Sequence, residues 1–151
     1  MRAVVQRVKR AEVLSRPGPD DDYVCVGRIG PGACVLIGVT HDDGQAEADA
    51  MSRKLAGLRI FGDDDGVMNL GAAEVDAEFL VVSQFTLYGD TTKGRRPSWV
   101  AAARPEHAEP LVDRVVDGLR STGLRVETGR FRTDMEVDLV NDGPVTLIVE
   151  T

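Results

Sequence analysis

The sequence predicts a single α/β domain: a mixed β-sheet of β-β-(βα)-(βα)-β-β-β order with two helices packed on it. Its 151 residues, 42% of them hydrophobic, are enough to form one sizeable core. Apolar runs of strand length alternate with two segments of helical periodicity, and strand-like runs close the chain. No repeat, linker or low-complexity tract divides the sequence, so we expect one domain over residues 1–151.

The chain is expected to open with a hairpin followed by a buried strand. Residues Ala3 to Val13 alternate apolar and polar like a half-exposed strand, and the polar loop Arg16 to Asp22 leads into a returning strand from Tyr23 to Ile29. The turn Gly30-Pro31-Gly32 then introduces Ala33 to Val39. That continuous apolar run is typical of a strand covered on both faces.

Two helices are predicted from the 3.6-residue period. The first spans Gln45 to Leu58, with Asp42 or Asp43 as its cap. Its apolar stripe is expected to be Ala46, Ala50, Leu55 and Leu58. The second spans Pro105 to Ser121 and is ended by Gly123. Its apolar face is expected to be Leu111, Val112, Val115, Val116 and Leu119.

Four more strands complete the predicted sheet. They are expected at Glu78 to Leu87, Arg125 to Thr128, Glu136 to Val140 and Val145 to Thr151. The segment Gly62 to Gly66 holds three consecutive aspartates but lacks the spaced acidic residues and terminal glutamate of an EF-hand. We therefore expect a surface turn there.

The charge of the chain opposes broad electrostatic binding to nucleic acid. The net charge is −7 and the pI is near 4.8, whereas such binding usually needs a basic surface. Any RNA contact must therefore be local. The only dense basic run, Lys93-Gly94-Arg95-Arg96, is either a phosphate-binding loop or an ordinary solvated one.

The expected compartment is the cytoplasm. No apolar run approaches the roughly 20 residues of a membrane span, and the N-terminus lacks a signal-peptide pattern. Cys25 and Cys34 lie in apolar runs without metal-ligand spacing, so both are expected to be reduced core residues.

Two polar segments stand out as candidate functional motifs. Ser83-Gln84-Phe85-Thr86 directly follows the buried strand Phe79 to Val82, which places hydroxyl and amide groups at a strand end where a pocket can form. Asn141-Asp142-Gly143-Pro144-Val145-Thr146 lies near the C-terminus. There glycine supplies backbone freedom and proline supplies rigidity.

A serine or threonine nucleophile would need a neighbouring base. His41 follows a strand and precedes two aspartates, and His107 falls in the first turn of the second helix. Neither belongs to a recognisable triad pattern, so the residues do not favour this mechanism. No cluster with metal-ligand spacing is present either.

The two polar segments together resemble the signature motifs of the D-aminoacyl-tRNA deacylase family, and the likeness extends from Met1 to the last residues. It implies an enzyme that hydrolyses the ester of D-aminoacyl-tRNA to free tRNA and D-amino acid, without metal or another cofactor. Glycyl-tRNA is expected to be accepted as well, because glycine has no side chain to exclude. The resemblance also implies a homodimer with its sites at the subunit interface.

The resemblance assigns roles to particular residues. Ser83, Gln84, Phe85 and Thr86 would form the catalytic site, where main-chain N–H groups stabilise the oxyanion and the tRNA 2′-hydroxyl assists. Thr86 is either a nucleophile or a pocket-lining residue. A cis Gly143–Pro144 peptide would enter the partner's pocket and reject L substrates. The remaining assigned residues are Asn141, Val145, Thr146 and Met135 for substrate, and Lys93, Arg95 and Arg96 for RNA.

Some positions depart from the family pattern. Arg132-Thr133 stands where the family usually has Gly-Ala, and Trp99 where it has Phe. The site role of Met135 therefore competes with simple packing. Two alternative functions remain open at this point: a noncatalytic module that binds the tRNA end or a nucleotide, and an interaction protein that assembles through its sheet edge.

Overall fold

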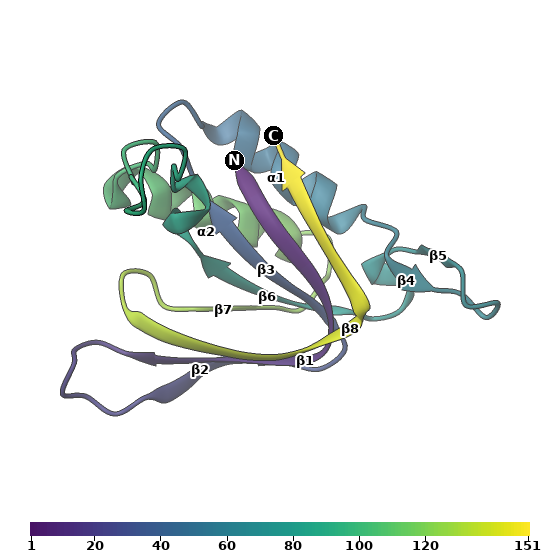
Figure 1. Ribbon diagram of the computed structural model, residues 1–151. Coiled ribbons are helices and arrows are strands. Elements are labelled where there is room, and N and C mark those ends of the chain that lie inside the picture. The colour runs from purple at the N-terminus through teal and green to yellow at the C-terminus, as the bar shows by residue number, and fades with distance from the viewer.

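The computed structural model describes residues 1–151 as one mixed sheet with two helices on one face (Figure 1). The helices are α1 (Gln45–Ala56) and α2 (Pro105–Arg120), and the 3₁₀ helices are η1 (Ala72–Glu74) and η2 (Phe85–Tyr88). The strands are β1 (Arg2–Arg16), β2 (Val24–Ile29), β3 (Gly32–Gly38), β4 (Phe61–Gly62), β5 (Met68–Leu70), β6 (Glu78–Ser83), β7 (Val126–Thr128) and β8 (Asp134–Glu150). The predicted fold class is confirmed.

Strand β1 organises the sheet because it has three partners. Its first half pairs with β3 and its second half with β2 along one edge, while β8 follows the other edge over almost the whole length. All of these pairs are antiparallel, whereas β3, β6 and β7 are mutually parallel. In Figure 1, β1 and β8 curve together, and the two chain termini lie close to one another.

The main core lies between the sheet and the two helices. The predicted apolar face of α2 is confirmed, since all five of its residues are buried. The predicted stripe of α1 is largely wrong: its buried residues are Ala48, Met51, Ser52 and Leu55. The buried side of α1 differs from the predicted stripe because α2 packs against it, with Gly118 of α2 next to Ser52 of α1.

The start of α1 also differs from the prediction. Gly44 is the N-cap, and its N–H donates to the Glu47 carboxylate at 2.8 Å. Asp43 is buried and accepts a 2.6 Å bond from the N-terminal ammonium of Met1. Its other carboxylate oxygen accepts the Thr40 N–H. This aspartate therefore holds the N-terminus instead of capping the helix.

Several strand boundaries need correction. The strand predicted to run to Leu87 ends at Ser83, because η2 follows it. The last two predicted strands are one continuous strand, β8, which is irregular near Gly143. A small β4–β5 hairpin around the acidic turn was not predicted.

The two cysteines behave differently from one another. Cys34 is buried in the second core cluster, and burial raises the pKa of its thiol to about 11. Cys25 is exposed near the start of β2, so its prediction as a core residue is wrong. The pairing of β1 with β2 has a register shift between Val13 and Leu14, just before the pair that includes Cys25.

No helix in the structure is both long enough and apolar enough to cross a membrane.

Candidate active site

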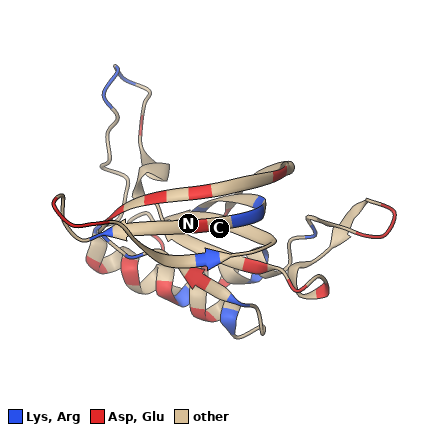
Figure 2. Cartoon of the chain, turned by 90° about the horizontal axis from the view of Figure 1, so that it is seen from below, with Lys and Arg blue, Asp and Glu red and all other residues tan.

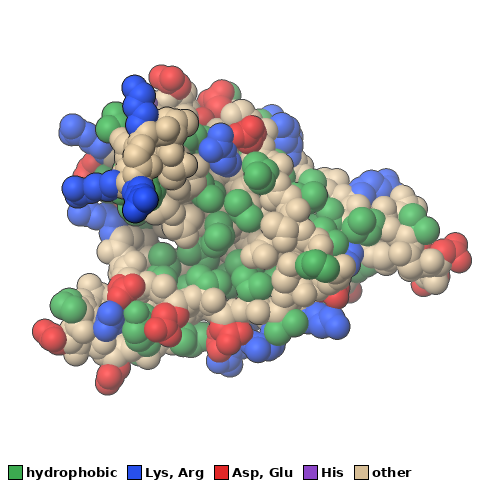
Figure 3. All heavy atoms as spheres, in the orientation of Figure 1, with side chains coloured by type: hydrophobic (Ala, Val, Ile, Leu, Met, Phe, Trp, Pro, Cys, Tyr) green, Lys and Arg blue, Asp and Glu red, His purple; other side chains and the backbone are tan.

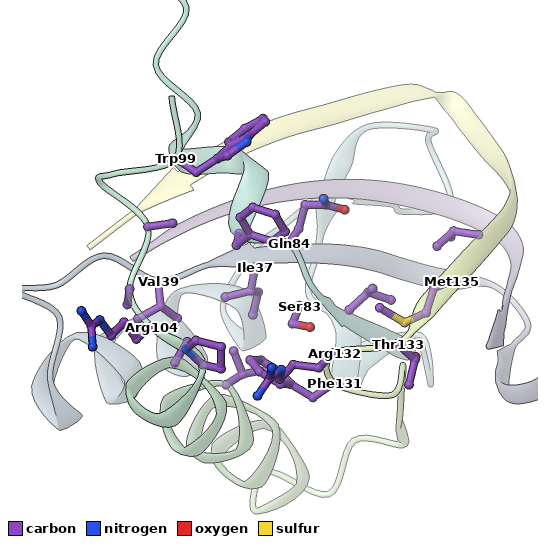
Figure 4. A pocket seen from close by; sticks show the side chains of 18 residues that line it. Ile37, Val39, Ser83, Gln84, Trp99, Arg104, Phe131, Arg132, Thr133 and Met135 are labelled. Carbon is purple, nitrogen blue, oxygen red and sulfur yellow. The ribbon is translucent and has the colours of Figure 1, made fainter. Parts of the chain in front are cut away.

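A cavity of about 700 Å³ opens where the parallel strands β3 and β6 end. Its walls come from η2, the segment before α2, and the turn between β7 and β8 (Figure 4). Twelve of its eighteen lining residues are hydrophobic, and none is an aspartate or a glutamate. Such a cavity has the size and apolar character of a small-ligand site.

The first predicted motif supplies one wall of this cavity. Ser83, Gln84 and Phe85 all line it. The N–H of Gln84 donates to the Ile37 carbonyl at 2.6 Å, which extends the β3–β6 pairing by one residue before the chain turns into η2. Gly38 allows this turn, since a Cβ there would lie only 3.0 Å from the Gln84 carbonyl.

Thr86 does not line the cavity. It is exposed on η2, and its hydroxyl accepts a hydrogen bond from the Gln84 side-chain amide. Within the chain, Thr86 therefore orients Gln84. The sequence prediction left a nucleophilic role and a lining role open. Thr86 does not line the cavity of its own chain, and its role in the reaction stays a prediction.

Two aromatic side chains form the upper rim of the cavity. Phe85 and Trp99 meet edge to face, with ring centroids 5.6 Å apart and an interplanar angle of 75°. Both are partly open to solvent, at 57% and 42% exposure. Trp99 packs over Gly89, where a Cβ would lie 2.4 Å from the indole ring. Exposed aromatic faces of this kind can stack on nucleobases.

The turn between β7 and β8 forms the opposite wall. Phe131, Arg132, Thr133 and Met135 line the cavity, so Met135 lies where the prediction put it. Met135 also packs against the second core cluster, so it contributes both to packing and to the lining. Arg132 has φ of +58°, a left-handed conformation that favours glycine. This turn explains why glycine suits position 132.

The second motif lies elsewhere, at the irregularity of β8. Gln6 pairs with Thr146 and Val8 with Asn141, so the four residues 142 to 145 bulge out opposite Arg7. The Asn141 side-chain amide closes this bulge by donating to the Arg7 and Val145 carbonyls at 2.9 and 3.0 Å. The Thr146 hydroxyl donates to the Asn141 side-chain oxygen at 3.3 Å.

The Gly143–Pro144 peptide is trans, which corrects the cis bond that the resemblance implied. Gly143 has φ of +97° within the bulge, a backbone conformation that glycine adopts readily. Trans is also the form that X–Pro bonds ordinarily prefer. The guanidinium of Arg7 supports the bulge: its Nε lies 3.3 Å from an Asp142 carboxylate oxygen, and Nη1 donates to the Ile60 carbonyl.

The structure does not bring the two motifs together within one chain. Arg7, Asp142, Gly143 and Val145 line a second, more open cavity beside the β4–β5 hairpin. Gly143 and Pro144 are exposed at the surface of the bulge. A second molecule can therefore contact this dipeptide directly.

The basic run lies on a projecting loop next to the cavity. Asp90 and Ser98 exchange two backbone hydrogen bonds of 2.8 and 2.9 Å that close the base of this loop. Bonds from the Thr92 N–H and hydroxyl lower the pKa of Asp90. Lys93, Arg95 and Arg96 are exposed toward its tip, which is blue in Figure 2. In Figure 3, blue side chains gather above a hollow lined with hydrophobic ones.

Neither histidine assists a hydroxyl in the motifs. The His41 ring bonds to the Val100 carbonyl and the His107 ring to the Asp43 carbonyl, both at 2.8 Å. No group of three or more His, Cys, Asp or Glu side chains is arranged to hold a metal ion. The chemical resources of the cavity are thus hydroxyl, amide and arginine side chains together with main-chain groups.

Most residues that line the cavity were not predicted as site residues, among them Ala102, Arg104 and Phe131. These three lie far from both motifs in sequence, and nothing in their local pattern marks them. Trp99, which departs from the family pattern, was not predicted to line the site. Its position one residue beyond the Asp90–Ser98 pair turns it toward Phe85.

Comparison with known proteins shows which family the chain resembles. The family model described as D-Tyr-tRNA(Tyr) deacylase matches residues 4–150. D-aminoacyl-tRNA deacylases from Symbiobacterium thermophilum and Anaeromyxobacter dehalogenans are 55% and 54% identical over 151 residues, covering all of this chain and 96% and 97% of theirs.

Solved structures show the same fold. One described as "c-Myc DNA Unwinding Element Binding Protein" is 38% identical, with a TM-score of 0.88 over 100% of this chain and 99% of its own. A probable eukaryotic D-amino acid tRNA deacylase shares the fold, with a TM-score of 0.80 at 19% identity over 99% of this chain and 98% of its own. On the full-length family match and the identity to these relatives, the chain belongs to the D-aminoacyl-tRNA deacylase family.

Proposed function

We propose that this protein hydrolyses the ester bond of D-aminoacyl-tRNA, and of glycyl-tRNA, releasing free tRNA and the amino acid. The observation that carries the proposal is the apolar cavity at the ends of β3 and β6, which holds Ser83, Gln84 and Phe85 and opens beside the basic loop. A terminal nucleoside with its amino acid fits a cavity of this size, and the loop can contact the RNA backbone.

The chemistry we propose relies on the substrate for its assisting group. No histidine contacts Ser83 or Thr86, so a protein nucleophile would lack a base. The ribose 2′-hydroxyl next to the ester can assist instead. The protein then contributes position and electrostatics. The N–H groups of Phe85 and Thr86, which begin η2 and have no acceptor within it, would stabilise the oxyanion.

Chiral selection is proposed to come from a second subunit. Gly143 and Pro144 are exposed, and neither lines the cavity at the ends of β3 and β6 in their own chain. The same strand, β8, exposes several large apolar side chains: Val137, Val140, Leu147 and Ile148. A two-fold interface over β8 would bury these side chains and carry each Gly143–Pro144 bulge toward the partner's cavity. There it would occupy the space that an L side chain needs.

The purified protein is expected to deacylate D-Tyr-tRNA much faster than L-Tyr-tRNA, and to do so equally well after treatment with EDTA. The expectation rests on the absence of a metal-ligand cluster. Ester loss from the two charged tRNAs is followed with and without chelator. Loss of activity in EDTA that zinc restores would contradict the proposed chemistry.

A companion substrate tests the 2′-hydroxyl directly. When D-Tyr is attached at the 3′ position of a tRNA ending in 2′-deoxyadenosine, the rate is expected to fall at least about a hundredfold, the lower end of the range of general acid–base contributions. An unchanged rate on this substrate would show that the hydroxyl does not assist.

The active species is expected to be a homodimer. Light scattering should give roughly twice the 16.3 kDa chain mass at assay concentration. Replacing Ile148, the most exposed of the apolar β8 residues at 71%, with Glu should shift the protein toward monomer and lower its activity. A wild-type monomer with full activity would rule out the cross-subunit site.

A further inference from the structure

We propose that Arg104 and Arg132 form a clamp for the phosphodiester group attached to the 5′ side of the substrate's terminal nucleoside. This inference rests on the proposed function, since it assigns part of the same cavity to a particular group of the RNA. The two arginines come from the start of α2 and from the β7–β8 turn, and both line the cavity. In Figure 4 they lie on the α2 side, across from Trp99 and Gln84.

The charge of the cavity is opposite to that of the protein. The chain has 25 acidic and 18 basic residues, yet the cavity is lined by two arginines and by no carboxylate. An apolar cavity with two cationic groups at its edge suits a ligand that is mostly apolar or aromatic and carries one anionic group. A nucleoside ester joined to a phosphodiester has this composition, whereas the esterified amino acid itself has no free carboxylate.

Both guanidinium groups are available to a ligand. Elsewhere in the chain, Arg16, Arg114 and Arg125 are each held by a carboxylate at 2.6 to 2.7 Å. The side chains of Arg104 and Arg132 make no hydrogen bond or ion pair and are exposed at the cavity edge. A planar guanidinium can bind two phosphate oxygens at once, so unpaired arginines at a cavity without carboxylates favour phosphate.

The backbone at Arg132 supports a ligand-binding role. Its φ of +58° is a conformation that residues with a side chain rarely adopt. The turn is fixed by its neighbour Thr133, whose hydroxyl donates to the Arg130 carbonyl at 2.9 Å and lies 2.6 Å from the Ser15 hydroxyl. Because Thr133 holds the turn, the arginine side chain is not required for its shape. An arginine at a glycine-like position is therefore better explained by what it binds.

The test uses two non-hydrolysable ligands that differ by one phosphate. The first is 3′-(D-tyrosylamino)-3′-deoxyadenosine, and the second is the same compound with a methyl phosphodiester at its 5′ oxygen. Dissociation constants are measured by calorimetry for the full-length protein. The wild type is expected to bind the phosphodiester roughly tenfold more tightly or better, as charge-assisted hydrogen bonds allow.

Arg132→Gly and Arg104→Gln should each lose most of this preference while binding the uncharged ligand as the wild type does. Arg132→Gly should also melt no lower than the wild type, because glycine accepts the positive φ. Arg130→Gln is the matched control, since Arg130 is exposed in the same turn but does not line the cavity. It should retain the full preference.

Three results would overturn the clamp. A wild-type protein that binds both ligands equally would show that no phosphate site exists, while the proposed function would stand. A preference that survives in both Arg132→Gly and Arg104→Gln would place the phosphate elsewhere, on the basic loop. A wild-type protein that binds neither ligand would contradict the proposed function and the clamp together.

Discussion

Replacing Gly143 with Ala is expected to lower the rate of D-aminoacyl-tRNA deacylation by about a hundredfold, the loss that a misplacement of about 1 Å can cause. A Cβ at this position would lie 2.5 Å from Nη2 of Arg7, and φ of +97° is unfavourable for alanine. The Arg7 guanidinium or the bulge must shift, and alanine is strained at this positive φ whichever of them moves. We therefore expect the dipeptide to be displaced from the contact with substrate proposed above. Single-turnover deacylation of D-Tyr-tRNA and L-Tyr-tRNA measures the effect.

The fold of the Gly143→Ala variant should persist, because residue 143 is exposed and the Asn141 bonds close the bulge from its base. Circular dichroism and light scattering check folding and assembly. Gly66→Ala is the matched control: Gly66 also has positive φ, at +77°, and lines the same second cavity, but a Cβ there meets no atom within 4 Å. If the folded, dimeric Gly143→Ala protein is as active as this control, the bulge has no role in the reaction.

Gly32→Ala is expected to prevent folding. A Cβ on Gly32 would lie 1.9 Å from the Glu78 carbonyl oxygen, at the point where β3 begins its parallel pairing with β6. Neither backbone can move without separating two central strands, so we expect a loss of about 4 to 5 kcal/mol or more. This is comparable to the whole stability of many domains.

Soluble yield and urea unfolding followed by circular dichroism measure the effect of Gly32→Ala. Gly30→Ala is the control from the same turn, because the nearest atom to its Cβ is 3.8 Å away and the Gly30 N–H can still donate to Glu78. We expect it to fold and unfold close to the wild type. A Gly32→Ala protein with wild-type stability would show that β3 and β6 are not as close as the structure has them.

Local sequence patterns predicted the elements whose surroundings are simple. Helix α2 rests on the core with one face and is exposed on the other, so its five buried residues follow directly from their spacing. Helix α1 is weakly amphipathic and rich in alanine, and contact with α2 decided which of its sides is buried. Close approach at Gly118, where a Cβ would lie 2.5 Å from the Ser52 hydroxyl oxygen, brings a polar residue of α1 into that interface.

The ends of elements depended on contacts between distant residues. The motif strand was predicted to continue through Leu87 because its residues are apolar and β-prone, but the chain turns into η2 after Gln84 bonds to Ile37. Asp43 has the sequence signature of a helix cap, yet its carboxylate binds the N-terminal ammonium of Met1 instead of the first N–H groups of the helix. In both cases a partner far along the chain outweighed the local preference.

By itself, the sequence determined the fold class, the family and the position of the two polar motifs. Each of these depends on patterns within short segments of the chain. Hydrophobic periods and turn residues indicate the fold class, and the segments Ser83 to Thr86 and Asn141 to Thr146 indicate the family. Only the tertiary structure decided which residues share a cavity. It set Trp99, Arg104 and Arg132 around Ser83 and Gln84, and it placed Gly143 and Pro144 at a separate surface. The physical reason is that a cavity is formed by the ends of strands and by the loops between them, and their positions depend on strand pairing and helix packing across the whole chain.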